Sequence, residues 1–309
     1  MVIRVKPRER FDPVAGEEGE NGEKAGQSGE PGFDPKAHSL RSLRVEGYRG
    51  LVFATFSDAA APLCDYIGEQ MRPWIDRIFH KPIVYLGCTR QYSKSNWKLY
   101  TENIKDPYHA SLLHLFHTTF NILRVGMKAR AIPDATHGLH SVLTVTKNEE
   151  ANTAEYREQR IRSFNQGFVL EDPSLLDHVQ EYDELTTNHI QSIFPQLVLQ
   201  QIHNTLVARQ LLPKGPSNFE LIFHFFGYAD DTSELRALRI KQANLVGPAG
   251  YISMEDTEAT ELVQRGIHRH DETESLILMG HDRPEQQDSL ITESLIRKFW
   301  IGYQRLMDL

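Results

Sequence analysis

The chain has 309 residues, of which 40% are hydrophobic, and a formal net charge of −8 at pH 7. Because domains usually contain ~100–200 residues, a chain of this length can bury one large core or two modest ones. The charges are spread along the sequence without a Lys/Arg-rich run that could neutralise a row of phosphates, so nucleic acid is excluded as the expected partner.

Membrane insertion and disulfide bonding are not expected either. No stretch approaches the ~20 apolar residues that a membrane span requires, and the charged first residues do not resemble a signal peptide. The two cysteines, Cys64 and Cys88, are too few for a disulfide framework, which is usual in a reducing compartment. We therefore expect a cytoplasmic protein.

The first part of the chain predicts a flexible segment followed by two strands and a helix. Residues 13–35 are rich in Gly, Glu and Pro and cannot offset the entropy of ordering themselves. Alternating apolar residues predict two paired strands within 43–56, joined by a turn at 47–50. Apolar positions at three- and four-residue intervals predict a helix over 61–80, with Pro73 as a potential break.

The rest of the chain predicts strands that are grouped together, with helices inserted between them. The expected strands are 83–86, 141–145, 196–201, 205–212 and 220–227. The expected helices are 97–120, 231–245 and 290–307. This order is typical of an α+β domain built on an antiparallel sheet.

The first of these helices contains the motif Asp-x-x-His-x-x-x-x-His, formed by Asp106, His109 and His114. Two imidazoles and one carboxylate from elsewhere can hold Fe(II) and leave coordination positions open for dioxygen. Asp106 and His109 lie about 60° apart around an ideal helix, so the carboxylate can orient the imidazole. The two histidines lie about 140° apart, so a metal site requires the helix to widen or bend between Ala110 and Leu113.

The same motif also fits a chain without a metal. The sequence contains 14 histidines, and His109 and His114 could lie one on a polar face and the other in the core. Isolated histidine pairs are common, so the spacing alone leaves both alternatives open.

Three segments resemble a single enzyme family. The catalytic-domain signature of Rieske non-heme iron oxygenase large subunits is similar to the run NWKLYTENIKDPYHASLLHLFHTTF. The end of that family's Rieske domain is similar to LRVEGYRGLVFATFSD, and its third-ligand segment is similar to QANLVGPAGYISMEDTEATELVQRGI. The likeness runs from about Gly32 to the C-terminus, and is closest to large subunits that act on terephthalate, salicylate or anthranilate.

The resemblance implies a role for each residue of the motif. His109 and His114 fall on the family's iron histidines, and Asp256 falls on its iron carboxylate. Glu255 is the competing ligand, since a shift of one position exchanges the two acids, but the GPAG turn before them favours Asp256. Asp106 falls on the aspartate that links an iron histidine to the Rieske cluster of the adjacent subunit.

The resemblance also implies residues that bind the substrate. Relatives acting on aromatic carboxylates have arginines near the substrate, and a guanidinium can bind a carboxylate through two hydrogen bonds. Arg209 and Arg297 fall on the corresponding positions, although either could equally be a surface arginine. Asn103 and Tyr108 are expected at the floor of the pocket. His117 is expected to pack beside the ligands or to support them.

The implied fold is a helix-grip fold of the START and Bet v 1 type, in which an antiparallel sheet wraps around a long helix. A Rieske 2Fe–2S cluster needs C-x-H and C-x-x-H pairs, and this sequence contains neither. We therefore expect residues 1–57 to be the remnant of a truncated Rieske domain, and residues 58–309 to be the mononuclear iron domain. The alternative is a partner chain that supplies the cluster.

The implied function is the insertion of oxygen from O2 into an aromatic carboxylate at Fe(II), by a monooxygenase or a dioxygenase. Electrons would come from NAD(P)H through a reductase or ferredoxin and the cluster, so we expect the chain alone to be inactive. The family also implies a homotrimer, with or without a small beta subunit. The alternatives are a non-catalytic module that binds the aromatic acid and an inert, degenerate product.

Overall fold

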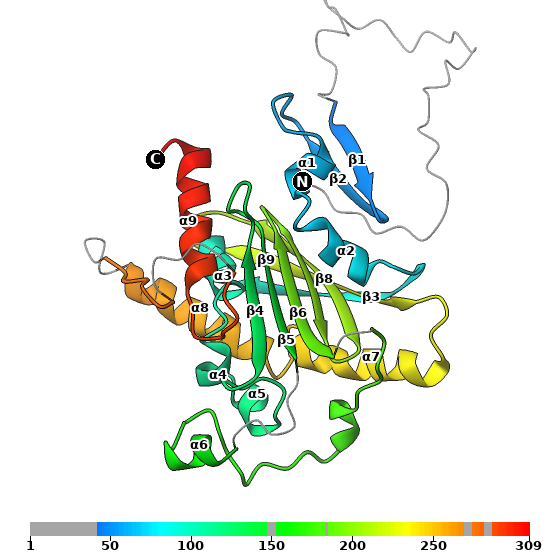
Figure 1. The fold of residues 1–309 in the computed structure, drawn as a ribbon, viewed down its shortest axis with the longest axis vertical. Coiled ribbons are helices and arrows are strands. Elements are labelled where there is room, and N and C mark those ends of the chain that lie inside the picture. Colours follow the sequence, from blue (N-terminus) through cyan, green and yellow to red (C-terminus); the bar gives the residue numbers. More distant parts are fainter. Residues whose placement is uncertain (1–41, 147–152, 183–184, 269–273, 281–285) are drawn as a thin grey trace, which may run out of the picture.

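A seven-stranded antiparallel sheet forms the centre of the computed structural model, which describes residues 42–146, 153–182, 185–268, 274–280 and 286–309. Its strands are β3 (Ile83–Ser93), β4 (Lys128–Pro133), β5 (Ser141–Thr146), β6 (Thr186–Ile193), β7 (Leu197–Ile202), β8 (Thr205–Pro213) and β9 (Phe219–Tyr228). The strand order across the sheet is β3-β9-β8-β7-β6-β5-β4. Together with the helices of Figure 1, this sheet confirms the α+β class.

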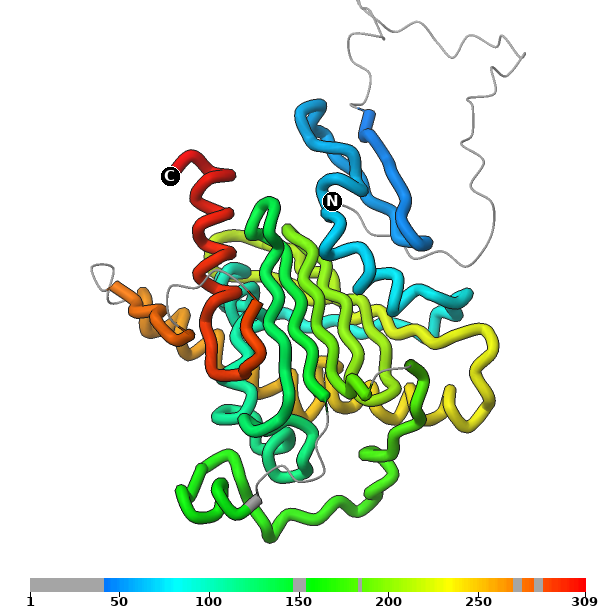
Figure 2. Tube along the Cα trace, viewed as in Figure 1, coloured from blue at the N-terminus to red at the C-terminus, as the bar shows by residue number. Residues whose placement is uncertain are grey.

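One face of the sheet is covered by two helices that flank the motif and by two later helices. These are α3 (Trp97–Asn103), α5 (Leu115–Thr119), α7 (Ser233–Val246) and α8 (Ser253–Ile267). Their apolar side chains share a buried core with alternate residues of the sheet, among them Tyr100 of α3, Val207 of β8 and Leu245 of α7. Figures 1 and 2 show α7 and α8 following one another behind the sheet.

Two short helices cover the other face, and a hairpin packs against them. The hairpin consists of β1 (Arg44–Tyr48) and β2 (Leu51–Thr55), and the helices are α1 (Leu63–Ile67) and α2 (Arg72–Ile78). Phe53 of the hairpin and Ile75 of α2 are buried in one core with Leu199 and Phe226 of the large sheet. The hairpin is thus packed onto the sheet through α1 and α2, although it forms a separate two-stranded sheet.

The local predictions for this region are confirmed with one change. The two paired strands are present, and their turn residues Arg49 and Gly50 have φ angles of 52° and 84°, as a two-residue hairpin turn of type I′ requires. The helix expected over 61–80 is split, but at Gly68, whose φ angle is 81°, and not at Pro73. Pro73 lies in the first turn of α2, where its missing amide hydrogen has no cost.

The helix predicted over 97–120 is wrong as a single element. It consists of α3, α4 (Ala110–Leu113) and α5, separated by non-helical residues. Pro107 disfavours the helical conformation of Asp106 before it, and the Asp106 Oδ1 atom accepts a hydrogen bond from the backbone N–H of Tyr108, 2.8 Å away.

The remaining strand predictions and the last two helices are confirmed in position, with α9 at Ser294–Met307. Five elements were not predicted, namely β4, β6, the helix α8, the short helix α6 (Thr153–Glu158) and the 3-10 helix η2 (Pro173–Leu176). The segment 13–35, expected to be flexible, lies outside the described residues.

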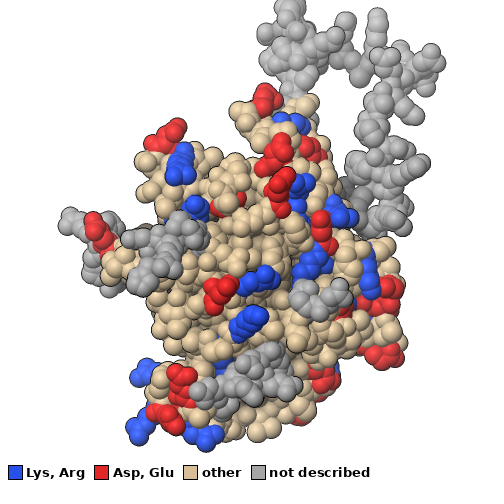
Figure 3. Space-filling model, viewed as in Figure 1, with Lys and Arg blue, Asp and Glu red and all other residues tan. Residues whose placement is uncertain are grey.

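The surface of the described residues carries charges of both signs. Figure 3 shows acidic and basic side chains interspersed over the face in view. None of the helices in the described ranges is both long enough and apolar enough to cross a bilayer.

Candidate metal centre

The breaks in the predicted helix determine how the two histidines point. His109 lies directly before α4, and His114 lies between α4 and α5 with an extended backbone conformation, φ −81° and ψ 100°. The expected distortion is therefore present, but it lies at His114 itself and not within Ala110–Leu113. Because α4 ends after a single turn, the second imidazole can turn back toward the first.

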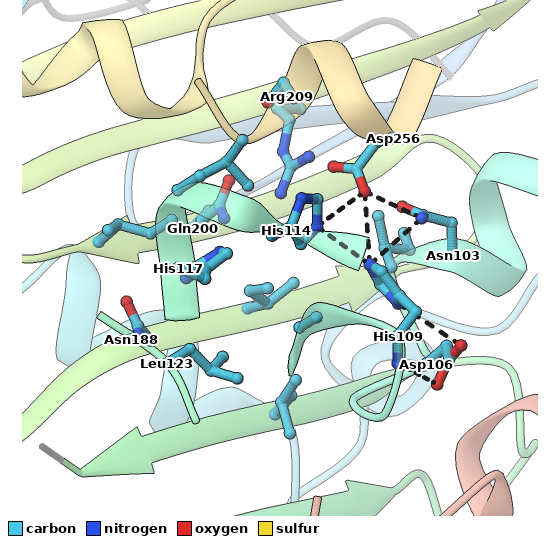
Figure 4. A pocket seen from close by; sticks show the side chains of 17 residues that line it. Asn103, Asp106, His109, His114, His117, Leu123, Asn188, Gln200, Arg209 and Asp256 are labelled. Atoms are coloured by element: carbon cyan, nitrogen blue, oxygen red, sulfur yellow. Dashed lines mark hydrogen bonds and ion pairs between the residues drawn. The ribbon is translucent and has the colours of Figure 1, made fainter. Parts of the chain in front are cut away.

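The third group comes from a helix much later in the sequence. Asp256 lies in the first turn of α8, and its Oδ1 atom is 3.3 Å from His109 Nε2 and 3.1 Å from His114 Nε2. The two Nε2 atoms are themselves 3.3 Å apart. The three side chains thus offer donor atoms that lie within 4.8 Å of one another. Figure 4 shows them pointing toward a common point.

This donor set fits a ferrous ion. The 2-His-1-carboxylate iron sites bind the metal through two imidazole nitrogens and one carboxylate oxygen. These three donors occupy one side of the ion and leave the other positions open for other ligands. The donors are largely shielded from water, with side-chain exposures of 2% for His114, 10% for Asp256 and 21% for His109.

Each histidine also contacts a carboxylate through its other ring nitrogen. Asp106 Oδ2 lies 3.5 Å from His109 Nδ1, and Glu255 Oε2 lies 2.8 Å from His114 Nδ1. The hydrogen bond between His114 and Glu255 is of the kind that fixes the tautomer and orientation of a metal-binding imidazole, whereas Asp106 lies within ion-pair distance of His109. Glu255, the competing ligand in the sequence, therefore contacts the far side of the His114 ring, whereas Asp256 lies where the two Nε2 atoms converge.

The electrostatics of the triad reflect this crowding of opposite charges. Burial alone lowers the pKa of His109, but the carboxylates of Asp106 and Asp256 outweigh it and raise that pKa to about 10. Burial opposes ionisation of Asp256, but His114 and His109 outweigh it and hold the pKa of Asp256 well below its usual range. The ionised carboxylate of Asp256 thus favours a cation at the point where the three side chains converge.

A cavity opens beside the triad, with an empty volume of about 550 Å³ including its opening. Its apolar lining includes Leu123, Leu143, Ile190, Ile202 and Ile252. Its buried polar lining includes His117, Asn188, Gln200 and Arg209, which are labelled in Figure 4. None of Asn188, Gln200 and His117 was predicted to bind substrate.

The four other site residues expected from the sequence lie in different places. Asn103 lines the cavity and its Nδ2 atom donates to Asp256 Oδ1 over 3.0 Å. Arg209 also lines the cavity and donates to the Tyr100 hydroxyl. Tyr108 is not among the lining residues. Arg297, on α9, is not among them either, and its guanidinium donates to the carbonyl oxygen of Met279 over 2.9 Å.

A family model described as "Ring hydroxylating alpha subunit (catalytic domain)" matches residues 85–308. The chain belongs to this family. The match covers the whole triad and the cavity, so the resemblance inferred from the sequence is confirmed, and the chain is related to oxidoreductases of the ring-hydroxylating oxygenase type.

The chain is also similar in sequence to individual proteins of the ring-hydroxylating family. It is 77% identical to the Anthranilate 1,2-dioxygenase large subunit of Burkholderia cepacia over 283 residues. The aligned region covers 91% of this chain and 67% of that relative. It is 44% identical over 283 residues to the Terephthalate 1,2-dioxygenase terminal oxygenase component subunit alpha 2 of Comamonas sp. That aligned region covers 91% of this chain and 68% of the relative. The chain thus spans about two thirds of the length of these relatives.

Solved structures support the fold. Naphthalene 1,2-dioxygenase from Rhodococcus sp. bound to indole matches with a TM-score of 0.68 and 19% identity, over 85% of this chain and 66% of that one. At this identity the likeness concerns the sheet and helices alone.

Proposed function

We propose that this chain is the iron-binding catalytic part of a ring-hydroxylating dioxygenase that acts on anthranilate or a similar aromatic carboxylate. The observation that carries the proposal is the convergence of His109, His114 and Asp256 at the end of a cavity that also contains the buried cation of Arg209. The 77% identity to an anthranilate 1,2-dioxygenase large subunit supports the choice of substrate.

In this proposal the three converging side chains hold Fe(II). When bound there, the ion supplies the activation of dioxygen. Asp106 and Glu255 hold the two imidazoles by their Nδ1 atoms, and Asn103 holds the carboxylate of Asp256 through its Nδ2 donor. The apolar cavity walls exclude water from the ring.

Arg209 is the proposed partner of the substrate carboxylate. Its side chain is 3% exposed, it has no ion pair among the described residues, and its Nε atom has no hydrogen-bond partner. By contrast, the equally buried Arg239 is ion-paired with Asp231 and Glu181. A buried cation without an anion is costly, so a cavity that contains one favours an anionic ligand.

The wider assembly is part of the proposal. Following the family, we infer that Asp106 connects the iron site to the 2Fe–2S cluster of an adjacent subunit in a cytoplasmic trimer. NAD(P)H would supply electrons through a reductase or ferredoxin. The segment 1–57 is proposed as the end of a Rieske domain, which is consistent with the separate sheet formed by β1 and β2.

The test is to load the full chain with Fe(II) under nitrogen, add anthranilate, and then add hydrogen peroxide. Peroxide supplies oxygen that is already reduced by two electrons, so no cluster is needed. About one iron per chain and a hydroxylated ring product by mass spectrometry are expected, with both lost in Asp256→Ala. Equal iron binding by the parent chain and by Asp256→Ala would contradict the proposal, and so would the absence of product in iron-loaded protein that binds anthranilate.

A further inference from the structure

Three buried polar side chains lie on one diagonal across the helix-covered face of the sheet. Asn188 is on β6, Gln200 on β7 and Arg209 on β8. Gln200 pairs directly with Ile190 on one side and Val207 on the other, so Asn188 and Arg209 are its diagonal neighbours. Diagonal neighbours lie ~7–8 Å apart, within reach of a small molecule between longer side chains.

All three residues line the cavity beside the triad, and all are at least nine-tenths buried, with exposures of 4%, 4% and 3%. The Asn188 Oδ1, Gln200 Oε1 and Arg209 Nε atoms have no hydrogen-bond partner. A buried polar atom without a partner costs free energy, and a native structure rarely retains several together without a ligand for them.

The orientation of the Asn188 amide is fixed. Its Nδ2 atom donates to the carbonyl oxygen of Ile122 over 3.1 Å, which leaves Oδ1 as the free acceptor. The cavity therefore offers a cation at one end of the diagonal and two amide oxygens along the rest. The cation suits an anionic group of a ligand, and the two amide oxygens suit a neighbouring group with two N–H donors.

We infer that Gln200, with Asn188 behind it, determines specificity for an amino group next to the carboxylate of the ring substrate. The inference rests on the proposed function, which supplies the ring acid and its carboxylate contact with Arg209. Gln200 is the direct neighbour of Arg209 on the diagonal, so it faces the ring position next to the carboxylate. The apolar residues Leu123, Leu143 and Ile202 of the same cavity then enclose the ring.

A second carboxylate at that position would face the fixed oxygen of Asn188, and an unsubstituted ring would leave the amide oxygens unpaired. Both cases are unfavourable for the same reason, since an acceptor needs a donor when water is excluded. The cavity thus discriminates by hydrogen bonding and not by size.

The test compares the binding of anthranilate and benzoate, which differ only in the amino group. Dissociation constants are measured by calorimetry on the full chain loaded with Fe(II) under nitrogen. The parent chain is expected to bind anthranilate about tenfold or more tightly than benzoate, as for one or two buried hydrogen bonds. Gln200→Met keeps the length of the side chain without its acceptor, and is expected to lose most of this preference while its affinity for benzoate stays within about twofold.

Gln210→Met is the matched control, because Gln210 lies on β8 and points to the opposite face of the sheet. Its preference is expected to equal that of the parent chain. Gln200→Met is also expected to unfold at the same urea concentration as the parent chain or at a higher one, since it removes an unpaired buried acceptor. A lower midpoint would indicate a structural role and overturn the inference. Asn188→Leu provides a second variant, expected to reduce the preference in the folded protein.

The outcomes separate this inference from the function on which it rests. Equal affinity of the parent chain for the two acids, or an unchanged preference in Gln200→Met, would overturn the role of Gln200 while an acid-binding cavity remains. Binding of neither acid would overturn the proposed function itself.

Discussion

Glu255 and Asp256 are adjacent in the sequence, yet they contact opposite sides of the His114 ring. Glu255 Oε2 lies 2.8 Å from Nδ1, and Asp256 Oδ1 lies 3.1 Å from Nε2. The ring is therefore held between two carboxylates at the start of α8. The two acids thus differ in role because of their positions on that helix and not because of their residue type. Asp256 faces the other histidine, and Glu255 orients the ring.

Glu255→Gln is expected to weaken iron binding about 10- to 100-fold, because the oriented carboxylate also makes the imidazole a stronger ligand. The dissociation constant of Fe(II) is measured by competition with a chelator. Glu258→Gln is the control, since Glu258 lies on the exposed side of the same helix. Similar affinities in the two variants would show that Glu255 has no part in the site.

The triad could be predicted from the sequence because its chemistry is carried by a short motif and a recognisable segment around Asp256. The break at His114 followed from simple helix geometry, although its position did not, because it depends on the extended backbone of that one residue. The role of Glu255 could not be predicted, since the two neighbouring acids offer the same chemistry and only the direction of α8 distinguishes them.

The strands were predictable where apolar residues dominate, as in β8 and β9. Strand β6 was missed because polar residues interrupt the apolar pattern that a sequence analysis relies on. Asn188 on that strand and Gln200 on β7 are buried because a cavity needs polar groups in the core. Asn188 thus helps to interrupt the apolar pattern of β6 and is also proposed to recognise the substrate.

The hairpin β1–β2 is expected to unfold together with the large sheet. Phe53 is 5% exposed and belongs to the core shared with α2 and the sheet, so Phe53→Ala is expected to lower the free energy of unfolding by about 3–5 kcal/mol. Phe56 is 53% exposed, so Phe56→Ala is the matched control and is expected to change the free energy of unfolding by about 0.5 kcal/mol. Urea unfolding measures both, and an unchanged main transition in Phe53→Ala would indicate a hairpin that folds independently.

Lys105 is expected to make stability depend on pH above neutrality. It is 1% exposed, donates to Leu139 O and Ser141 Oγ, and burial lowers its pKa to about 7. Between pH 7 and the unfolded value of about 10.4, the unfolded chain binds one proton more than the folded chain, so the free energy of unfolding rises with pH by up to about 1.4 kcal/mol per unit. Below pH 7 this contribution no longer changes.

The measurement is urea unfolding of the parent chain and of Lys105→Met at pH 7 and pH 9. The difference in unfolding free energy, parent minus variant, is expected to increase over that interval by about 2 to 3 kcal/mol. The Ser141 and Ser192 hydroxyls lie 2.8 Å apart and can pair with each other in the variant. Parallel pH profiles of the two proteins would mean that Lys105 keeps an ordinary pKa in the folded state.

Gly250 is expected to control the position of α8, and with it the position of Asp256. A Cβ atom at Gly250 would lie 2.6 Å from the carbonyl oxygen of Leu245, so Gly250→Ala must displace the turn before the helix. We expect a loss of about 1–3 kcal/mol in unfolding free energy and weaker Fe(II) binding. Gly266, near the end of the same helix, has open space around its Cβ position, so Gly266→Ala is expected to stabilise by about 0.5–1 kcal/mol. Iron titration and urea unfolding of both variants provide the comparison, and normal iron affinity in Gly250→Ala would show that the turn does not determine where Asp256 lies.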